Sequence, residues 1–334
     1  MGTDYILSIE SSCDDTSAAV FKNNNIVANV TYNQKVHEKY GGVVPELASR
    51  KHHQKILPVV IAALYEAKID KHHLSAIAVT KGPGLLGSLL VGVSFAKSMA
   101  AALDIPIIEV NHMQAHILAH FIEEPYPSFP FLCLTVSGGH TQIVKVNDHL
   151  DMEVIGTTID DAAGEAFDKA GKMLGLPYPA GPHIDKLANQ GQNTFRFAKP
   201  KVDGHNFSFS GLKTSILYYL KKEIKENPKF IENNLNDLCS SIQSTIVEIL
   251  IKKLTIASEE YKIQDLAIAG GVSANSGLRK ELQKLSESND WNVFVPEFQY
   301  CTDNAGMIGI TAYYKFLKKE FSSFDMAPEP RMKF

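Results

Sequence analysis

The chain has 334 residues, of which 45% are hydrophobic and 21% charged, proportions typical of a globular protein of one or two domains. A net charge of −4 excludes binding of nucleic acid by bulk charge, so such a partner must meet a local basic patch or a basic partner protein. The four cysteines are far apart and form no CxxC pair, which argues against a structural zinc knot and fits a reducing compartment.

The first residues predict a β-hairpin. Residues 5–10 are an apolar strand, residues 11–16 a polar turn and residues 17–22 a returning strand. The turn carries the carboxylates Asp14 and Asp15, which could bind a magnesium–phosphate group or act as a general base. A solvated acidic turn is the alternative, because Asp is a common turn residue.

The next elements are two predicted helices, residues 45–68 and residues 85–103. The apolar stretch 85–108 is interrupted by serines, a lysine and an aspartate, which favours a buried helix and a strand over a membrane span. The glycine-rich segment 80–88 lacks the GK[ST] ending of a phosphate-binding P-loop. The N-terminus shows no pattern of a signal peptide.

A helix expected over residues 113–123 raises the possibility of a metal site. His112 and His116 are four residues apart, which places both imidazoles on one helix face. They could chelate a divalent metal if a third ligand came from elsewhere; surface histidines are the alternative. Met113 stands where zinc peptidases of the HExxH type carry their general-base glutamate, so a peptidase of that type is disfavoured.

A second hairpin is expected from residues 131–136 and 141–146, joined by a turn with Gly138 and Gly139. Paired glycines allow a ligand phosphate to approach the backbone, although a plain hairpin turn explains them equally. Two hairpins of the same design suggest an internal duplication, and the alternation of strands and helices indicates the α/β class.

The segment 160–210 is rich in glycine, proline and polar residues, and we expect an insertion that carries function as well as helix. Its basic and aromatic side chains could grip a nucleic-acid backbone and stack bases: Arg196, Phe197, Lys199, Lys201, His205, Phe207 and Phe209. Long helices are predicted over residues 213–225 and 235–258.

The last part of the chain supplies two further candidates. A strand at residues 266–269 runs through two glycines into a helix near Asn275, a geometry that suits a phosphate or ribose. Asp303 lies between a strand at residues 291–295 and a helix at residues 305–316. It is either the N-cap of that helix or the carboxylate of a site with two histidines.

The order of short motifs along the chain resembles the TsaD family, from about Ile6 to about Ile310. The blocks that carry the resemblance are IESSCDDTSAAV, GGVVPELASRKH, GPGLLGSLLVG, NHMQAH, TVSGGHTQIV, DDAAGEAFDKAGKMLG, PAGPHID, FSFSGLKT, AIAGGVSAN and CTDNAGMI. In the last block Gly306 replaces the alanine that is usual in the family, a change expected to matter little.

The resemblance implies an actin/Hsp70/sugar-kinase-like (ASKHA) fold, in which two duplicated RNase H-like lobes enclose a nucleotide cleft. It implies an N-terminal lobe made of residues 1–110 and 306–334. A C-terminal lobe of residues 111–305 is then expected to hold the metal and the nucleotide substrate.

The resemblance also implies an activity. The family transfers a threonylcarbamoyl group from threonylcarbamoyl-AMP to N6 of the adenosine beside the anticodon, in tRNAs that read ANN codons, and releases AMP. One divalent metal, Fe²⁺ with Zn²⁺ as the alternative, is expected on His112, His116 and Asp303. Asp14 is the expected catalytic residue. The expected substrate-binding residues are Thr135, Val136, Ser137, Gly138, Gly139, Asp168, Gly181, Asp185 and Asn275.

Partners implied by the resemblance are tRNA, threonylcarbamoyl-AMP, a TsaB-like paralogue and a TsaE-like ATPase, in the cytoplasm and without a membrane. Three other functions stay open: an ATPase or kinase of the same fold, a metallopeptidase, which the missing glutamate disfavours, and a scaffold that only senses nucleotide.

Overall fold

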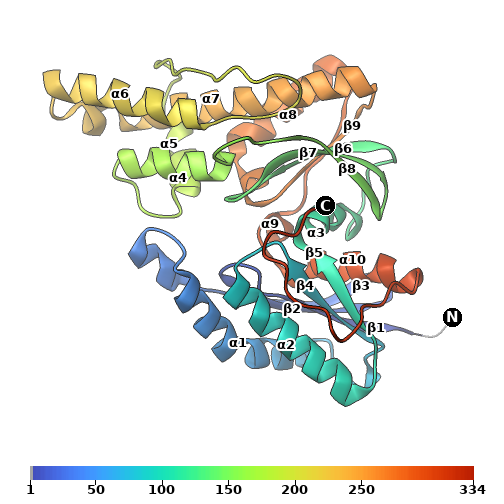
Figure 1. Cartoon of the computed structure of the whole chain (residues 1–334). Coiled ribbons are helices and arrows are strands. Elements are labelled where there is room, and N and C mark those ends of the chain that lie inside the picture. The colour runs from blue at the N-terminus through green and yellow to red at the C-terminus, as the bar shows by residue number, and fades with distance from the viewer. Residues whose placement is uncertain (1–2) are drawn as a thin grey trace. The chain divides into compact units, whose positions relative to one another are not determined.

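The computed structural model describes residues 3–334, and the chain divides into two compact units, each with its own five-stranded sheet (Figure 1). Unit 1 comprises Met1–Tyr126, Asp148–Met152 and Pro296–Phe334. Unit 2 comprises Pro127–Asn147 and Glu153–Val295. Unit 1 is therefore discontinuous, and the whole of unit 2 lies between its parts in the sequence.

The sheet of unit 1 has the strand order β3-β2-β1-β4-β5. Its strands are β1 (Tyr5–Glu10), β2 (Asp15–Lys22), β3 (Asn25–Asn33), β4 (Ala76–Gly82) and β5 (Ile107–Asn111). The first three strands form an antiparallel meander, whereas β4 pairs parallel to β1 and β5 parallel to β4. Strands β1 and β4 are almost continuously buried, as expected for strands covered on both faces.

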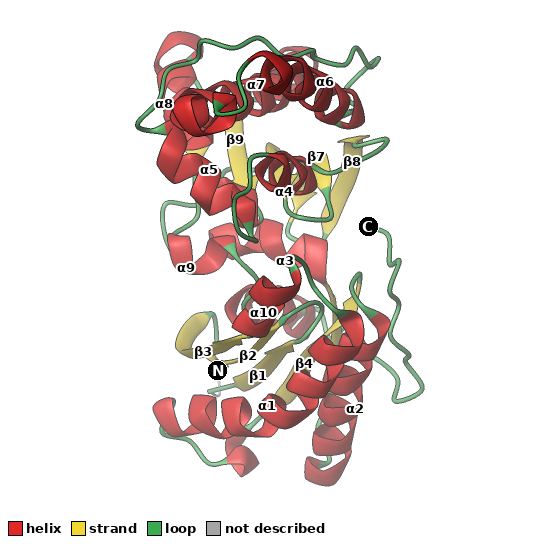
Figure 2. Ribbon diagram, turned by 90° about the vertical axis from the view of Figure 1, so that its left-hand side faces the viewer, coloured by secondary structure: helices red, strands yellow, loops and turns green. Residues whose placement is uncertain are grey.

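Helices cover both faces of this sheet (Figure 2). The helices of unit 1 are α1 (Pro45–Glu66), α2 (Leu86–Leu103), α3 (His112–Leu118), α9 (Phe298–Cys301) and α10 (Ala305–Leu317), with short 3-10 turns η1 (Lys35–Tyr40), η2 (Lys71–His73) and η3 (Ala119–Phe121). Leu7 and Ile9 of β1 belong to the core formed with α1 and α2. Ser8, one residue between them, donates a hydrogen bond to the carbonyl of Ala305, so the opposite face packs on α10.

Helix α2 is long and apolar enough to cross a membrane when judged by length and composition alone. One such helix is weak evidence, because core helices of other proteins pass the same test. One face of α2 packs on the sheet: Leu89, Val93 and Ala96 are buried, and Val93 and Ala96 belong to the core of the unit 1 sheet, whereas Leu86 and Leu90 are exposed.

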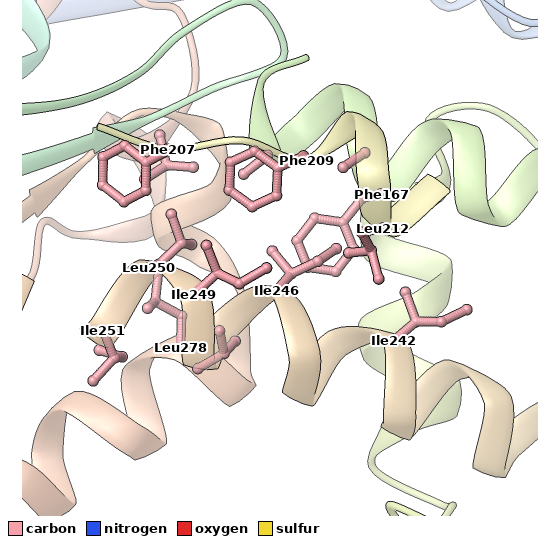
Figure 3. Packing of buried hydrophobic residues seen from close by; sticks show 14 of the residues in the cluster. Phe167, Phe207, Phe209, Leu212, Ile242, Ile246, Ile249, Leu250, Ile251 and Leu278 are labelled. Atoms are coloured by element: carbon pink, nitrogen blue, oxygen red, sulfur yellow. The ribbon is translucent and has the colours of Figure 1, made fainter. Parts of the chain in front are cut away.

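The sheet of unit 2 has the order β10-β9-β6-β7-β8. Its elements are β6 (Phe131–Val136), β7 (Thr141–Asp148), β8 (Asp151–Thr157), β9 (Asp265–Ala269), β10 (Asn292–Phe294), α4 (Ala163–Met173), α5 (Ala180–Ala188), α6 (Ser210–Glu226), α7 (Phe230–Tyr261), η4 (Gly271–Ala274) and α8 (Ser276–Asn289). Figure 3 shows part of its core, where Phe167 of α4 and Phe209 lie against Ile246 of α7.

The two sheets repeat one design. In unit 1 the order β3-β2-β1-β4-β5 places a three-stranded meander beside two parallel strands. The sheet of unit 2, taken from its other edge as β8-β7-β6-β9-β10, has the same arrangement. Both hairpins, β1–β2 and β6–β7, are antiparallel, and the first strand of each pairs parallel with a later strand. The α/β class and the duplicated strand–turn–strand unit are thus confirmed.

The boundaries of the units differ from those expected for the lobes. Residues 111–126 and 296–305, expected in the C-terminal lobe, belong to unit 1, and so do residues 148–152, which comprise the β7–β8 turn and the adjoining strand ends. The reason is packing: α3 follows directly from β5 and lies against α10. The segment 160–210 contains helix, as expected, and its helices α4 and α5 contribute to the core of unit 2.

Candidate functional site

The first two candidate metal ligands lie at the junction of β5 and α3. Asn111 ends β5 and caps the helix, and its Oδ1 accepts hydrogen bonds from the backbone N–H groups of Met113 (2.9 Å) and Gln114 (3.2 Å). His112 and His116 then stand one turn apart, with ring centroids separated by 4.7 Å and ring planes nearly perpendicular. Both side chains are buried, which rules out the alternative of surface histidines.

Asp303 comes to the same place from the loop before α10. Its Oδ1 lies 3.2 Å from Nε2 of His116 and 3.4 Å from Nε2 of His112. The cap of α10 is Asn304, whose Oδ1 accepts from the backbone N–H of Met307 at 3.1 Å. The alternative that Asp303 is the N-cap is therefore wrong, and its carboxylate is left to face the two rings.

The three side chains form a group with the geometry of a metal site. One ligand atom from each of His112, His116 and Asp303 lies within 4.8 Å of the others, and all three residues belong to unit 1. The rings present the nitrogens farther from the backbone, and Asp303 keeps 25% of its side chain exposed. Two imidazoles and one carboxylate suit a divalent ion such as Fe²⁺ or Zn²⁺, so the donor set fits the expected metal.

The charges of the group compensate one another. Burial opposes the charged form of His112, but the carboxylates of Asp303 and Glu10 hold the pKa of that ring well above its usual value. Burial likewise opposes ionisation of Asp303, and the two histidines outweigh it and hold the pKa of that carboxyl far below its usual range. Because a metal binds neutral imidazole, binding would release the proton from His112.

Glu10 is a member of this network that the sequence pattern does not single out. Its Oε2 lies 3.0 Å from Nδ1 of His112, on the side of the ring away from Asp303. The available signal is a glutamate at the end of the otherwise apolar strand β1. A carboxylate in such a strand is rare unless it has a partner.

Asp14, the expected catalytic residue, lies at the tip of the β1–β2 hairpin in the same unit. Its side chain is half-buried, and burial is the main cause that raises the pKa of its carboxyl. A raised pKa makes a carboxylate a stronger proton acceptor. Its neighbour Asp15 is affected more strongly, because burial and the charge of Asp303 raise its pKa to about 8.

The turn at the end of β6 is a tight glycine turn of unit 2, held by hydrogen bonds to Ser137. Ser137 Oγ accepts hydrogen bonds from the backbone N–H groups of Gly139 (3.3 Å) and His140 (3.1 Å). A Cβ built on Gly138 or Gly139 would meet no atom within 4 Å, so a ligand has access to the backbone there. Gly164, in the first turn of α4, donates its N–H to the Ser137 carbonyl at 3.2 Å, which places a helix N-terminus beside the turn.

The other expected substrate residues of unit 2 either lie at helix N-termini, as Gly181 and Asn275 do, or hydrogen-bond to the first residue of a helix, as Asp168 and Asp185 do. Asp168 accepts a hydrogen bond from the backbone N–H of Ala180 at 2.7 Å, beside Gly181 in the first turn of α5. Asp185 accepts from the N–H and the hydroxyl of Ser276, next to Asn275. Asn275 caps α8 through the N–H of Leu278. Each of these side chains thus has a structural partner of its own.

Part of the expected nucleic-acid contact is contradicted. Phe207 and Phe209 are fully buried in unit 2 and Phe197 is 7% exposed, so these rings cannot stack on bases (Figure 3). They are core residues, which explains why aromatic residues alternate with polar ones in this segment. Lys199 is instead paired with Glu248 of α7.

Comparison with known families decides between the functions left open. The family model "TsaD: tRNA N6-adenosine threonylcarbamoyltransferase" matches residues 25–310 of the chain. The chain belongs to the TsaD family. A relative from Christiangramia forsetii, named tRNA N6-adenosine threonylcarbamoyltransferase, is 62% identical over 98% of both chains. One of the same name from Cytophaga hutchinsonii is 56% identical over 98% of this chain and 96% of its own.

Solved structures resemble this TsaD-family chain in fold. HypF in its phosphate- and nucleotide-bound form superposes with a TM-score of 0.63 at 15% identity, over 94% of this chain and 46% of HypF. The ROK hexokinase of Thermus thermophilus gives 0.51 at 14% identity, over 94% and 99% of the two chains. These likenesses confirm the expected ASKHA fold class and, at such identities, carry no further argument.

Proposed function

We propose that this TsaD-family chain is the transferase that places a threonylcarbamoyl group on N6 of the adenosine beside the anticodon of tRNA. The donor is threonylcarbamoyl-AMP, the acceptor tRNAs read ANN codons, and AMP is released. The observation that carries the site assignment is the convergence of Asp303 with His112 and His116, in a chain that belongs to this family; Asp303 lies 187 positions after His116.

The difficulty of the reaction lies with the nucleophile. The donor is a mixed anhydride with a good leaving group, whereas the attacking exocyclic amine of adenine is weakly basic. It must be positioned and must lose a proton as the new bond forms. The side chains of this chain therefore have three tasks, which are to orient the acyl group, hold the adenylate and accept the proton.

Binding of the acyl group is assigned to the three proposed metal ligands of unit 1. A divalent ion held by His112, His116 and Asp303, Fe²⁺ with Zn²⁺ as the alternative, would orient the threonylcarbamoyl oxygens and polarise the carbonyl. The two imidazoles are fixed by their helix, and Asp303 is fixed by the start of α10. Asp14 is assigned as the proton acceptor, supported by its half-buried carboxyl with a raised pKa.

The adenylate is assigned to unit 2. The turn Thr135–Gly139, which includes Val136, Ser137 and Gly138, would hold the phosphate with backbone N–H groups, aided by the N-terminus of α4. Asp168 and Asp185 each keep acceptor capacity beyond their present hydrogen bonds, because an ionised carboxylate has about four acceptor positions. They would accept hydrogen bonds from ribose hydroxyls, with Gly181 and Asn275 against the rest of the AMP moiety.

The same assignment includes partners. A net charge of −4 gives little bulk attraction for phosphate, which favours shared binding of tRNA with other subunits. We assign a TsaB-like paralogue and a TsaE-like ATPase as these subunits and the cytoplasm as the place of action, with no membrane partner.

The test removes the ligands one at a time. His112→Ala or His116→Ala is expected to abolish both bound metal and transfer to unmodified tRNA, because each substitution removes one of three metal donors. The fold is expected to stay intact. Metal is measured by elemental analysis, transfer with threonylcarbamoyl-AMP, and folding by circular dichroism. His73→Ala is the matched control, since His73 is exposed on η2, and it should retain metal and transfer.

Full transfer by a metal-free His116→Ala protein would refute the role of the metal. ATP turnover with a phosphoryl acceptor that ignores both histidines would instead support a kinase of the same fold. Peptide cleavage that depends on the histidines would support a metallopeptidase.

A further inference from the structure

Glu10 is a buried carboxylate without a part in the proposed reaction. It ends β1, and its side chain has no exposed surface. Burial of an ionised carboxylate is strongly unfavourable unless hydrogen-bond donors surround it. The hydrogen-bond donors around Glu10 therefore indicate its role.

Three donors converge on this carboxylate. Oε1 accepts from the backbone N–H of Ser12, and Oε2 accepts from the hydroxyl of Thr80 at 2.6 Å. Oε2 also lies 3.0 Å from Nδ1 of His112. The strand β4, which carries Thr80, and the turn after β1 thus hold the carboxylate in place against the ring.

The position of the carboxylate determines where His112 carries its proton. An ionised carboxylate only accepts hydrogen bonds, so Nδ1 facing Glu10 must be the protonated nitrogen. Nε2 of the same ring faces the carboxylate of Asp303 at 3.4 Å, so without a metal it also faces an acceptor. Because Glu10 keeps Nδ1 occupied, Nε2 is the nitrogen at which a metal can replace a proton. His116 differs, because its buried Nδ1 has no hydrogen-bond partner within the described residues 3–334.

We propose that Glu10 is a positioning residue for the metal centre: it holds His112 in the tautomer and ring orientation that present Nε2 to the ion. The inference rests on the proposed metal role of His112, His116 and Asp303. A carboxylate behind a metal-binding imidazole raises the basicity of the ligand and fixes its direction. Glu10 therefore determines metal affinity without touching the metal.

The decisive variant is Glu10→Gln, which keeps the size of the side chain but replaces one acceptor oxygen with an NH₂ group. In one orientation the new NH₂ group faces the Ser12 N–H, which is also a donor, and that hydrogen bond is lost. In the other orientation it faces the Thr80 hydroxyl and donates to Nδ1 of His112, which then carries its proton on Nε2, where the metal binds. Zn²⁺ affinity of the metal-free protein is expected to fall by about 10–100-fold, as for other partners of metal-binding histidines. Affinity is measured by competition with a chelating indicator, without substrate.

Glu109→Gln is the matched control. Glu109 is also a strand carboxylate of unit 1, close to α3 in sequence, but its partner is Lys81 at 3.0 Å and not a histidine. This variant is expected to bind Zn²⁺ as the unsubstituted protein does. An equal loss in both variants would mean that general charge, rather than the contact with His112, sets the affinity, and would overturn the inference.

The outcomes separate this inference from the proposed function. If the unsubstituted protein binds Zn²⁺ and Glu10→Gln binds it equally well, the role of Glu10 fails while the metal site stands. If the unsubstituted protein transfers but holds no metal at the histidines, both fail.

Should Glu10→Gln not fold, a crystal structure of the unsubstituted protein with Zn²⁺ decides. Zinc on Nε2 of His112, with Nδ1 hydrogen-bonded to Glu10, supports the inference. Zinc bound by Glu10 itself, or by Nδ1 of His112, overturns it.

Discussion

His52 of α1 is a buried imidazole of unit 1 outside the candidate metal site, and its surroundings hold it neutral. Its Nε2 donates to the carbonyl of Cys13 at 2.9 Å, and its Nδ1 accepts from the hydroxyl of Thr16 at 2.8 Å. Burial is the main cause that lowers the pKa of this ring. The side chain thereby ties α1 to the start of β2, next to the turn that carries Asp14.

A lowered pKa predicts how stability responds to acid. As the pH falls below the ordinary histidine value of 6.5, the unfolded chain takes up a proton at this position before the folded chain does. The contribution of His52 is therefore present above that pH and lost as the pH falls through the folded pKa. The free energy of unfolding should fall less between about pH 8 and about pH 5.5 in His52→Gln than in the unsubstituted protein.

Urea denaturation at the two pH values measures this difference. His53→Gln is the control, because His53 is adjacent in sequence but exposed, and it should keep the pH response of the unsubstituted protein. A steeper response in His52→Gln would contradict the assignment of a neutral buried ring.

At this scale the sequence predicts part of the site. The spacing of His112 and His116 places two imidazoles on one helix face, because helix geometry is local. Their meeting with Asp303 is not a local property, and only the order of motifs along the chain predicts it. Glu10 stands out in the sequence as a glutamate in an apolar strand, but its partner His112 is identified only by the contact between β1 and α3. The roles of Asp14 and of the unit 2 residues stay predictions.

At the scale of elements, α10 fixes the position of Asp303, which immediately precedes its cap. The helix lies closely on the sheet because Gly309 has no side chain: a Cβ there would be 2.3 Å from the ring of Phe21 and 2.9 Å from Oγ of Ser8. Phe21 is fully buried in β2, so its ring has little room to move.

Gly309→Ala is therefore expected to destabilise the protein by about 1–3 kcal/mol through overpacking, despite the better helix propensity of alanine. Urea denaturation measures the change. Gly271→Ala is the control, since a Cβ added there would meet no atom within 4 Å. It should be nearly neutral; a Gly309→Ala protein as stable as the unsubstituted one would contradict the close packing.

Strands with a regular apolar pattern are predictable element by element, as β1 and β6 illustrate with the expected bounds. Helices α4 and α5 are not predictable from the sequence pattern in this way, for a physical reason. The buried face of α4 consists largely of alanine and glycine, which gives a weak signal. Helix α5 has no cap of its own, and its first N–H groups are satisfied by Asp168, which lies 12 residues earlier.

At the scale of the whole molecule, the two units have separate hydrophobic cores. Leu7 and Val93 belong to the core of unit 1, whereas Phe167 and Leu250 belong to that of unit 2. The proposed metal ligands lie entirely in unit 1 and the proposed phosphate turn entirely in unit 2. Each ligand should therefore stabilise the unit that binds it.

Hydrogen exchange followed by mass spectrometry tests this division. Zn²⁺ is expected to raise protection in peptides of unit 1 and AMP in those of unit 2, by roughly 2.7 kcal/mol at ligand concentrations about 100 times Kd. His116→Ala should abolish the response to Zn²⁺ and keep the response to AMP. Zinc-dependent protection that persists in this variant would place the ion elsewhere.

The discontinuity of unit 1 has a consequence for folding during synthesis on the ribosome. His116 and Asp303 are 187 positions apart, and the last piece of unit 1 begins only at Pro296. Since domains fold as units while the ribosome delivers them from the N-terminus, unit 2 has all its residues before the sheet of unit 1 receives α10. A nascent or prematurely ended chain lacks Asp303 and cannot bring the three proposed ligands together, so the proposed metal could bind to all three only after translation is nearly finished.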